Sequence, residues 1–254
     1  METAVFLIVS VGAHLLLLLL LVGSPALSVG VLVVYASYHG FVAWGVLHPR
    51  SRLFGPNRSR LSTTERVVAL TFDDGPDPEV TPRVLELLRA RGVRATFFLI
   101  GRSARRHPEI VRRIVAEGHA VGNHSDEHSY LFWALPPARL LRDVRAAQRA
   151  IEEACGAKCR WFRAPVGLKS CFLHAVLKRQ GLELVSWRIR FLERRPVDPR
   201  RLAARLRRRV AAGSIVMLHD GHDRKPMGRT EVLDALPVVL DVLEEAGYRC
   251  VPLG

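Results

Sequence analysis

Two long apolar runs open the chain, and no acidic or basic side chain interrupts either of them. They cover residues 4–22 and 27–47. Because an α-helix rises about 1.5 Å per residue, each run is long enough to cross a hydrocarbon layer about 30 Å thick. The pattern predicts a transmembrane helical hairpin that forms a membrane anchor at residues 1–49. We expect the histidine in each run, His14 or His39, to pack against the other helix or to lie near an interface.

A cleaved signal peptide is the alternative interpretation of the first run. Small residues follow its leucine-rich centre, as they do at a cleavage site. The three residues before the run, however, contain no basic side chain. This departure from the usual leader favours the hairpin.

Beyond residue 60, short β-branched runs alternate with longer amphipathic stretches, which is typical of repeated β/α units. Prolines open several of the amphipathic stretches and glycines close several, as expected for helices. The predicted strands lie at residues 67–72, 95–99, 119–122, 160–163, 183–187, 214–218 and 248–251. The predicted helices lie at residues 82–91, 108–117, 137–155, 172–180, 199–210 and 232–246. The chain therefore predicts an α/β domain of about seven parallel strands, either an open sheet or a barrel.

Charge bears on orientation and on partners. The formal net charge is +14, mostly from arginine, and an arginine-rich linker follows the second apolar run at residues 50–65. The positive-inside rule therefore predicts that the domain at residues 66–254 is cytoplasmic, with an extracytoplasmic domain as the alternative. No nucleic-acid motif accompanies the basic clusters, so we expect a membrane surface and no nucleic acid as partner.

The spacing of the four cysteines predicts no metal site, and the oligomeric state is left open.

Polar residues follow four of the predicted strands. Asp73 and Asp74 follow the first, residues 123–128 the third, residues 163–167 the fourth, and His219 the sixth. Parallel strands bring such ends to one edge of a sheet or one rim of a barrel. Adjacent carboxylates are costly to ionise together unless a positive charge lies near them, so the first strand predicts a cation at this rim. No Gly-rich phosphate loop follows that strand, which disfavours nucleotide binding.

Two histidines four residues apart, His124 and His128, are candidate nitrogen ligands for that cation. The spacing alone is a weak signal. Together with a strand-end carboxylate it gives two histidines and one acid, which leaves a coordination position for water or substrate, as in catalytic zinc sites. One of the adjacent acids can then bind the metal while the other takes a proton. Zn²⁺ is the expected ion, and Co²⁺, Mn²⁺ and Ni²⁺ tolerate the same ligands.

These residues, in this order, resemble the motifs of the polysaccharide deacetylase family of metal-dependent enzymes. The family motifs TFDDG, H-S/T-x-x-H, R-x-P-aromatic-Gly and hydrophobic-x-His correspond to TFDDG at residues 71–75, HSDEH at 124–128, RAPVG at 163–167 and MLH at 217–219. The resemblance extends from residue 66 to about residue 253. It implies a distorted (β/α) barrel of about seven strands, placed after the hairpin.

The resemblance also assigns roles to single residues. It implies that Asp74, His124 and His128 bind the metal and that Asp73 is the general base. Arg163, near Asp73, would keep that acid ionised.

Three further roles concern the acyl group. The backbone N–H of Val166 would hold the oxyanion, and His219 would protonate the leaving amine. The remaining candidates for the substrate-binding wall are Pro165, Trp187, Met217 and Leu218.

Two positions depart from the family pattern. Val166 stands where an aromatic residue is usual, which removes a ring from the sugar-binding wall. The acid that orients the catalytic histidine is not evident, and Glu193 is the best substitute, with Asp198 a poorer one.

The leading hypothesis is a membrane-anchored, metal-dependent hydrolase that removes an N-acetyl group from an amino sugar. The hairpin and the arginines after it suggest a lipid-linked substrate. One alternative is a non-catalytic, membrane-bound carbohydrate-binding relic. Another is a hydrolase of O-acetyl esters or linear amides, because the same metal site could attack either bond.

Overall fold

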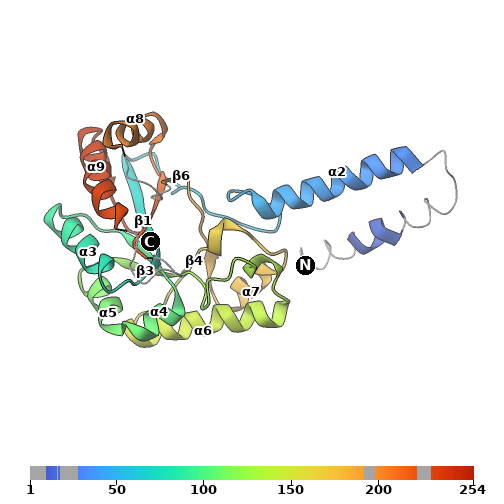
Figure 1. The fold of residues 1–254 in the computed structure, drawn as a ribbon, viewed down its shortest axis with the longest axis horizontal. Helices are drawn as coiled ribbons and strands as arrows, with labels where there is room; N and C mark the ends of the chain where they lie inside the picture. Colours follow the sequence, from blue (N-terminus) through green and yellow to red (C-terminus); the bar gives the residue numbers. More distant parts are fainter. Residues whose placement is uncertain (1–9, 16, 18–27, 192–197, 222–229) are drawn as a thin grey trace.

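The structure is a computed structural model that describes residues 10–15, 17, 28–191, 198–221 and 230–254. Helix α2 (Ser28–Leu47) projects from the rest of the molecule (Figure 1). By length and composition, its residues Val29–Leu47 could cross a membrane, and most of their surface is exposed. A signal sequence meets the same test, so the membrane anchor remains a prediction.

The second helix of the predicted hairpin corresponds to α2, whereas most of the first lies outside the described residues. Residues 10–15 are helical and run beside α2 (Figure 1). The ring of His14 lies 5.2 Å from that of His39 and 5.5 Å from that of Tyr35, measured between ring centroids. Each histidine therefore packs against the other helix, which is one of the two placements expected.

The domain is built on parallel strands: β1 (Val67–Gly75), β2 (Thr96–Leu99), β3 (Ala120–Asn123), β4 (Trp161–Phe162), β5 (Glu183–Leu184), β6 (Ile189–Arg190), β7 (Ile215–His219) and β8 (Arg249–Cys250). Seven of them follow the order β5-β4-β3-β2-β1-β7-β6, and β8 pairs with the start of β1. Each predicted strand overlaps one of these. Strand β6 was not predicted.

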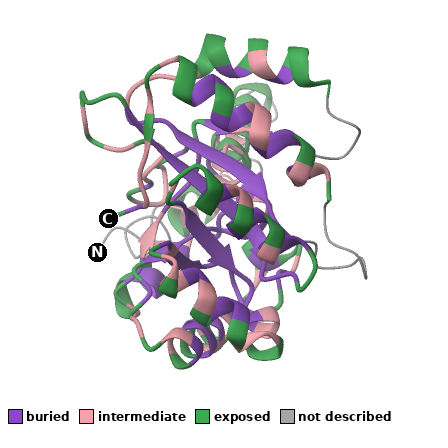
Figure 2. Cartoon of the chain, turned by 90° about the vertical axis from the view of Figure 1, so that its left-hand side faces the viewer, coloured by how far each residue is buried: buried purple, intermediate pink, exposed green. Residues whose placement is uncertain are grey.

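Helices cover the outer face of this sheet: α3 (Val80–Ala90), α4 (Gly101–Arg106), α5 (Pro108–Ala116), α6 (Pro137–Cys155), α7 (Leu173–Arg179), α8 (Pro199–Arg209) and α9 (Glu231–Glu245). Figure 2 shows the buried strands inside a layer of helices whose outward surfaces are exposed. Each predicted helix in the domain matches one of these, and the short helix α4 was not predicted.

The sheet curls into a half-barrel and does not close by pairing its edge strands. Among the described residues, β5 and β6 form the two ends of the strand order. The chain that links them crosses the gap, where Val185 pairs with Arg58 of the segment before β1. The predicted distorted barrel is therefore confirmed only as a curled, open parallel sheet. Part of the predicted linker pairs with that sheet.

Side chains alternate across the sheet and divide the core in two. In β1, Leu70 and Phe72 pack under the helices, whereas Ala69 faces a smaller inner cluster with Trp187 and Met217. The same alternation turns Thr71 and Asp73 toward the concave side. The carboxyl ends of β1, β3, β4 and β7 meet at the rim of this inner cluster.

Candidate metal centre and active site

The two acids at the end of β1 reach the same site because the strand stops alternating between them. In a regular strand, neighbouring side chains point to opposite faces. The register of β1 against β2 shifts between Asp73 and Gly75, as at a β-bulge. Asp74 adopts a φ of 74°, in the left-handed region. A bulge of this kind re-aims a side chain, and here it turns Asp74 toward the rim that Asp73 already faces.

The two histidines come from the loop after β3 and not from a helix. Ser125 and His128 both have positive φ, at 66° and 49°. Two local hydrogen bonds hold the loop: the N–H of Ser125 donates to Oδ1 of Asn123, and the N–H of His128 donates to Oγ of Ser125. The loop backbone, and not helical periodicity, brings both rings to one side.

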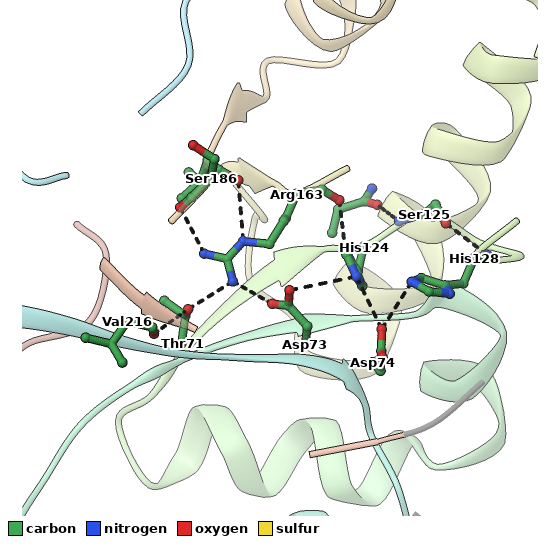
Figure 3. A network of polar contacts seen from close by, with 11 residues as sticks. Thr71, Asp73, Asp74, His124, Ser125, His128, Arg163, Ser186 and Val216 are labelled. Carbon is green, nitrogen blue, oxygen red and sulfur yellow. Dashed lines mark hydrogen bonds and ion pairs between the residues drawn. The ribbon is translucent and has the colours of Figure 1, made fainter. Parts of the chain in front are cut away.

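Asp74, His124 and His128 form one compact, buried donor set (Figure 3). Nε2 of His124 lies 3.3 Å from Oδ1 of Asp74, and Nε2 of His128 lies 3.1 Å from the same oxygen. One ligand atom from each residue lies within 4.8 Å of the other two. Nδ1 of His124 lies 2.8 Å from the backbone oxygen of Arg163, which fixes the ring with Nε2 toward the site.

The donor set fits a divalent cation. Two imidazoles and one carboxylate that converge on one buried site are the ligands that zinc and related ions take in catalytic sites. Burial by itself raises the pKa of Asp74, but the hydrogen bond with His124 and the charges of the nearby histidines hold it well below its usual value. Asp74 is therefore ionised at neutral pH, which is the form that binds a metal.

Asp73 forms a buried ion pair with Arg163. Nη1 of Arg163 lies 2.6 Å from Oδ1 of Asp73 and donates to Oγ1 of Thr71 at 2.9 Å. Nη2 and Nε donate to the backbone oxygens of Ser186 and Val185 at 3.3 and 3.4 Å. Arg163 is fully buried, with its guanidinium 4.0 Å from the centre of the Phe98 ring. The pair holds one oxygen of Asp73 and leaves Oδ2 4.0 Å from Nε2 of His124.

A small cavity of about 30 Å³ lies over this centre. Its lining residues are Asp73, Asp74, His124, His128, Tyr130, Ala164, Val166, Gly167, Trp187, Arg190, Met217 and His219. Val166 has a φ of 50°, which is strained for a β-branched residue and marks a constrained turn. The cavity therefore brings both acids, the histidines and this turn around one small space.

Two predicted wall residues lie elsewhere. Alternation along β7 turns Met217 and His219 toward the cavity and Leu218 into the core under the helices. The prediction that Leu218 belongs to the substrate-binding wall is therefore wrong, and the residue is part of the hydrophobic core. Pro165 is buried in the turn η3 (Pro165–Gly167) but is not among the residues that line the cavity.

Glu193 and Asp198 were the two acids predicted to orient His219. Glu193 lies outside the described residues. Oδ1 of Asp198 accepts from the backbone N–H groups of Arg200 and Arg201 at 2.9 and 3.3 Å, so that side chain caps α8. Its role is therefore in the helix and not at the histidine.

Sequence reasoning missed residues that line or support the site. Tyr130, two positions after His128, and Arg190 on β6 both line the cavity. In α6, Asp143 accepts from the backbone N–H groups of Asp126 and Glu127 at 3.0 and 3.2 Å. Proximity in sequence could have indicated Tyr130. The others come from elements whose position only the fold reveals.

Asp220 supports the end of β1 from below. Its N–H donates to the backbone oxygen of Asp73, and its Oδ2 accepts from Oγ1 of Thr81 at 2.6 Å. It lies so close to Gly75 that a Cβ there would stand 2.6 Å from Oδ2. Burial is the main cause that raises the pKa of Asp220 from 3.8 to about 8. At neutral pH the carboxyl group behind the end of β1 therefore keeps its proton.

Comparison with known proteins agrees with this architecture. The family model described as polysaccharide deacetylase matches residues 60–185. The chain is 36% identical over 211 residues to a chitooligosaccharide deacetylase of Azorhizobium caulinodans, covering 77% of this chain and 96% of that protein. It is 32% identical over 214 residues to a peptidoglycan-N-acetylglucosamine deacetylase of Bacillus cereus, covering 84% and 91%.

Among solved structures, the fold resembles a mutant of a CE4 family pseudoenzyme from Bacillus anthracis whose enzymatic activity was restored. The TM-score is 0.67 at 29% identity, and the match covers 77% of this chain and 68% of that chain. The fold alone therefore does not decide whether a chain of this shape is catalytic, and the side chains of the site carry that argument.

We predict that Asp220 makes the metal-free protein less stable as the pH rises. The folded state keeps a proton on a group whose pKa is about 8, whereas the unfolded state releases it near 3.8. The stabilisation is complete below the unfolded value and is lost as the pH rises through the folded one. In Asp220→Asn, the urea midpoint should fall less steeply between about pH 5 and about pH 8.

The matched control is Asp241→Asn, which changes an exposed aspartate on α9. It should keep the slope of the wild-type protein. If Asp220→Asn and the wild type lose stability equally with pH, Asp220 is ionised in the folded protein and this account of it is wrong.

Proposed function

The chain belongs to the polysaccharide deacetylase family, and from that premise we propose that it removes the N-acetyl group from an amino sugar within a carbohydrate. The observation that carries the proposal is the division of labour between two adjacent acids. Asp74 shares a buried donor set with His124 and His128, while Asp73 is held apart by Arg163. A binding protein has no need of such a pair, whereas a hydrolase needs both a metal ligand and a base.

Asp74, His124 and His128 would hold a divalent ion, with Zn²⁺ first and Co²⁺, Mn²⁺ or Ni²⁺ as alternatives. When bound, such an ion lowers the pKa of water and polarises a carbonyl oxygen. The backbone oxygen of Arg163 supports the set from behind through Nδ1 of His124. One arginine residue thus holds the base with its side chain and a ligand with its main chain.

Asp73 is the proposed general base. Its Oδ1 is engaged by Arg163, so Oδ2 is the oxygen that accepts a proton from water in the cavity. His219 is the proposed general acid. It stands on β7 directly beside Asp73 in the sheet register and lines the same cavity. A base and an acid on neighbouring strands can serve the two proton transfers that amide hydrolysis requires.

The N–H of Val166 is the proposed oxyanion donor. The strained turn places this residue in the lining of the cavity that both acids share. The valine side chain leaves that donor intact. Trp187 and Met217 form the apolar wall for the acetyl methyl, in a space of about 30 Å³.

The proposed substrate contains N-acetylglucosamine or a similar N-acetylated sugar. The curated relatives are a chitooligosaccharide deacetylase and a peptidoglycan-N-acetylglucosamine deacetylase. Tyr130, 40% exposed at the rim, offers an aromatic face to a sugar ring, and Trp133 is exposed on the same loop. This loop can supply some of the aromatic surface that Val166 lacks. An O-acetyl ester would fit the same cavity and belongs in the same substrate screen.

We further propose that α2 and the helix before it anchor the enzyme in a membrane, with a lipid-linked or membrane-proximal substrate. Helix α2 is apolar and largely exposed, which is unfavourable in water. The arginines that follow α2 favour a cytoplasmic domain, as the positive-inside rule describes. An enzyme held in this way would meet carbohydrates that are themselves attached to lipid.

A non-catalytic role is the second candidate, because the wild-type form of that related structure is a pseudoenzyme. The complete set of donor, base, ion-pair and histidine residues at the rim argues against it. The test is the release of acetate from N-acetylglucosamine oligomers and lipid-linked N-acetyl sugars, with O-acetylated sugars as a parallel substrate.

We expect Asp73→Asn to lower kcat at least about a hundredfold, because a positioned general base contributes that much or more. Asp241→Asn, on the exposed face of α9, should keep the wild-type rate. Acetate release and bound metal are measured on the same samples. If Asp73→Asn turns over as fast as the wild type, Asp73 is not the base.

A reporter fused to the C-terminus tests the orientation of the domain. A fluorescent protein that folds only in the cytoplasm should be bright, and alkaline phosphatase, which is active only outside it, should be inactive. The reverse pattern would place the domain outside and overturn the argument from arginine.

A further inference from the structure

The C-terminal end of α2 is built into the domain. The last turn approaches the following segment so closely that a Cβ on Gly45 would clash with Cδ2 of Leu53. The buried side chain of Asn57 donates to the backbone oxygens of Pro49 and Ser51 at 2.7 and 3.1 Å. The chain thus folds back on the helix end instead of leaving it as a flexible tether.

Lys169 caps this helix end. The last carbonyl groups of an α-helix have no partner within the helix, and a cation there is favourable. The N–H of Lys169 donates to the oxygen of Val46 in the last turn at 3.3 Å, and its Nζ donates at 2.6 Å to the oxygen of His48, the residue after the helix, which also accepts from the N–H of Ser51. Lys169 is only 3% exposed, and among the described residues it forms no ion pair with an acid. Burial lowers its pKa to about 8.

The same loop carries the proposed oxyanion donor. Val166 and Gly167, which precede Lys169 by three and two residues, line the active-site cavity. A Cβ on Gly167 would stand 2.6 Å from the ring of Trp187 and 3.5 Å from Cβ of Pro49. The loop is therefore packed between a wall of the cavity on one side and the end of α2 on the other.

We propose that Lys169 is a positioning residue that holds the Val166 loop against the C-terminal carbonyl groups of α2, so that the apolar helix is a structural part of the active site. The inference rests on the proposed deacetylase function. Lys169 touches the helix and not the cavity, so it acts through the loop. Displacing the end of α2 should therefore reduce turnover without removing any residue that contacts substrate.

The first test removes the side-chain part of the cap, the hydrogen bond from Nζ to His48, in the full-length protein purified in detergent. Lys169→Met keeps the length of the side chain and deletes its donor, Lys169→Arg restores a cation, and Lys178→Met is the control on the exposed face of α7. A misplaced oxyanion donor should lower kcat about tenfold while KM stays within about twofold. Arg should recover most of the loss, and Lys178→Met should have no effect.

The second test displaces the end of α2 by a substitution within the helix itself. Gly45→Leu must displace the contact with Leu53, whereas Gly40→Leu adds the same group on the same helix where nothing lies within 4 Å. Gly45→Leu should lower kcat as Lys169→Met does. The double variant should have a kcat no lower than that of either single variant, because both substitutions break the same contact between the Val166 loop and the end of α2. Gly40→Leu should match the wild type.

A readout independent of turnover separates this inference from the proposed function. Reductive methylation read by mass spectrometry should spare Lys169 and modify Lys178 in the wild type and in Gly40→Leu, and it should modify both in Gly45→Leu. Equal labelling of both lysines in the wild type would refute the docking. Exposure of Lys169 with unchanged kcat would refute the coupling. Protection of Lys169 in a protein that releases no acetate would instead refute the deacetylase function.

Discussion

The site depends on the bulge at Asp74. A strand that kept its alternation would send one of the two adjacent acids into the core under the helices and leave the other alone at the rim. The shift of register between Asp73 and Gly75 and the positive φ of Asp74 place both carboxylates on one side. Each acid then has its own partner: histidines for Asp74 and a guanidinium for Asp73. Two acids that are adjacent in sequence therefore have different partners and different proposed roles.

The open half-barrel lowers the free-energy cost of burying two adjacent carboxylates. Two buried like charges would repel unless positive charge lay near both. Arg163 supplies it for Asp73, and it also donates to Thr71 and to carbonyl groups in the segment between β5 and β6. That segment can turn its carbonyl groups inward because the edge strands do not pair with each other. The gap in the sheet is therefore part of the site, and removing the arginine would leave an uncompensated buried charge, a change that costs about 3–5 kcal/mol in other proteins.

Much of this could be predicted from the sequence, and the omissions have physical causes. Strand and helix positions follow apolar periodicity, and every predicted element of the domain has a counterpart. Among the strands and α-helices, β6 and α4 were missed because they lack that signal: β6 is one isoleucine and one arginine, and α4 is six residues long with two arginines in its last turn. Spaced motifs indicated the donor set, but no motif encodes the bulge or the lysine cap on α2. Leu218 was misplaced because a motif names positions and not the face on which each side chain lies.

The most direct measurement of the central claim is the metal content of Asp74→Asn beside that of Asp73→Asn. Both variants replace one oxygen of a buried acid with nitrogen, one position apart. If the bulge divides the two roles, Asp73→Asn will bind about one equivalent of zinc by mass spectrometry of the dialysed protein, whereas Asp74→Asn will lose about tenfold or more in affinity. Equal zinc binding by the two variants would contradict the account, because the acids would then be interchangeable.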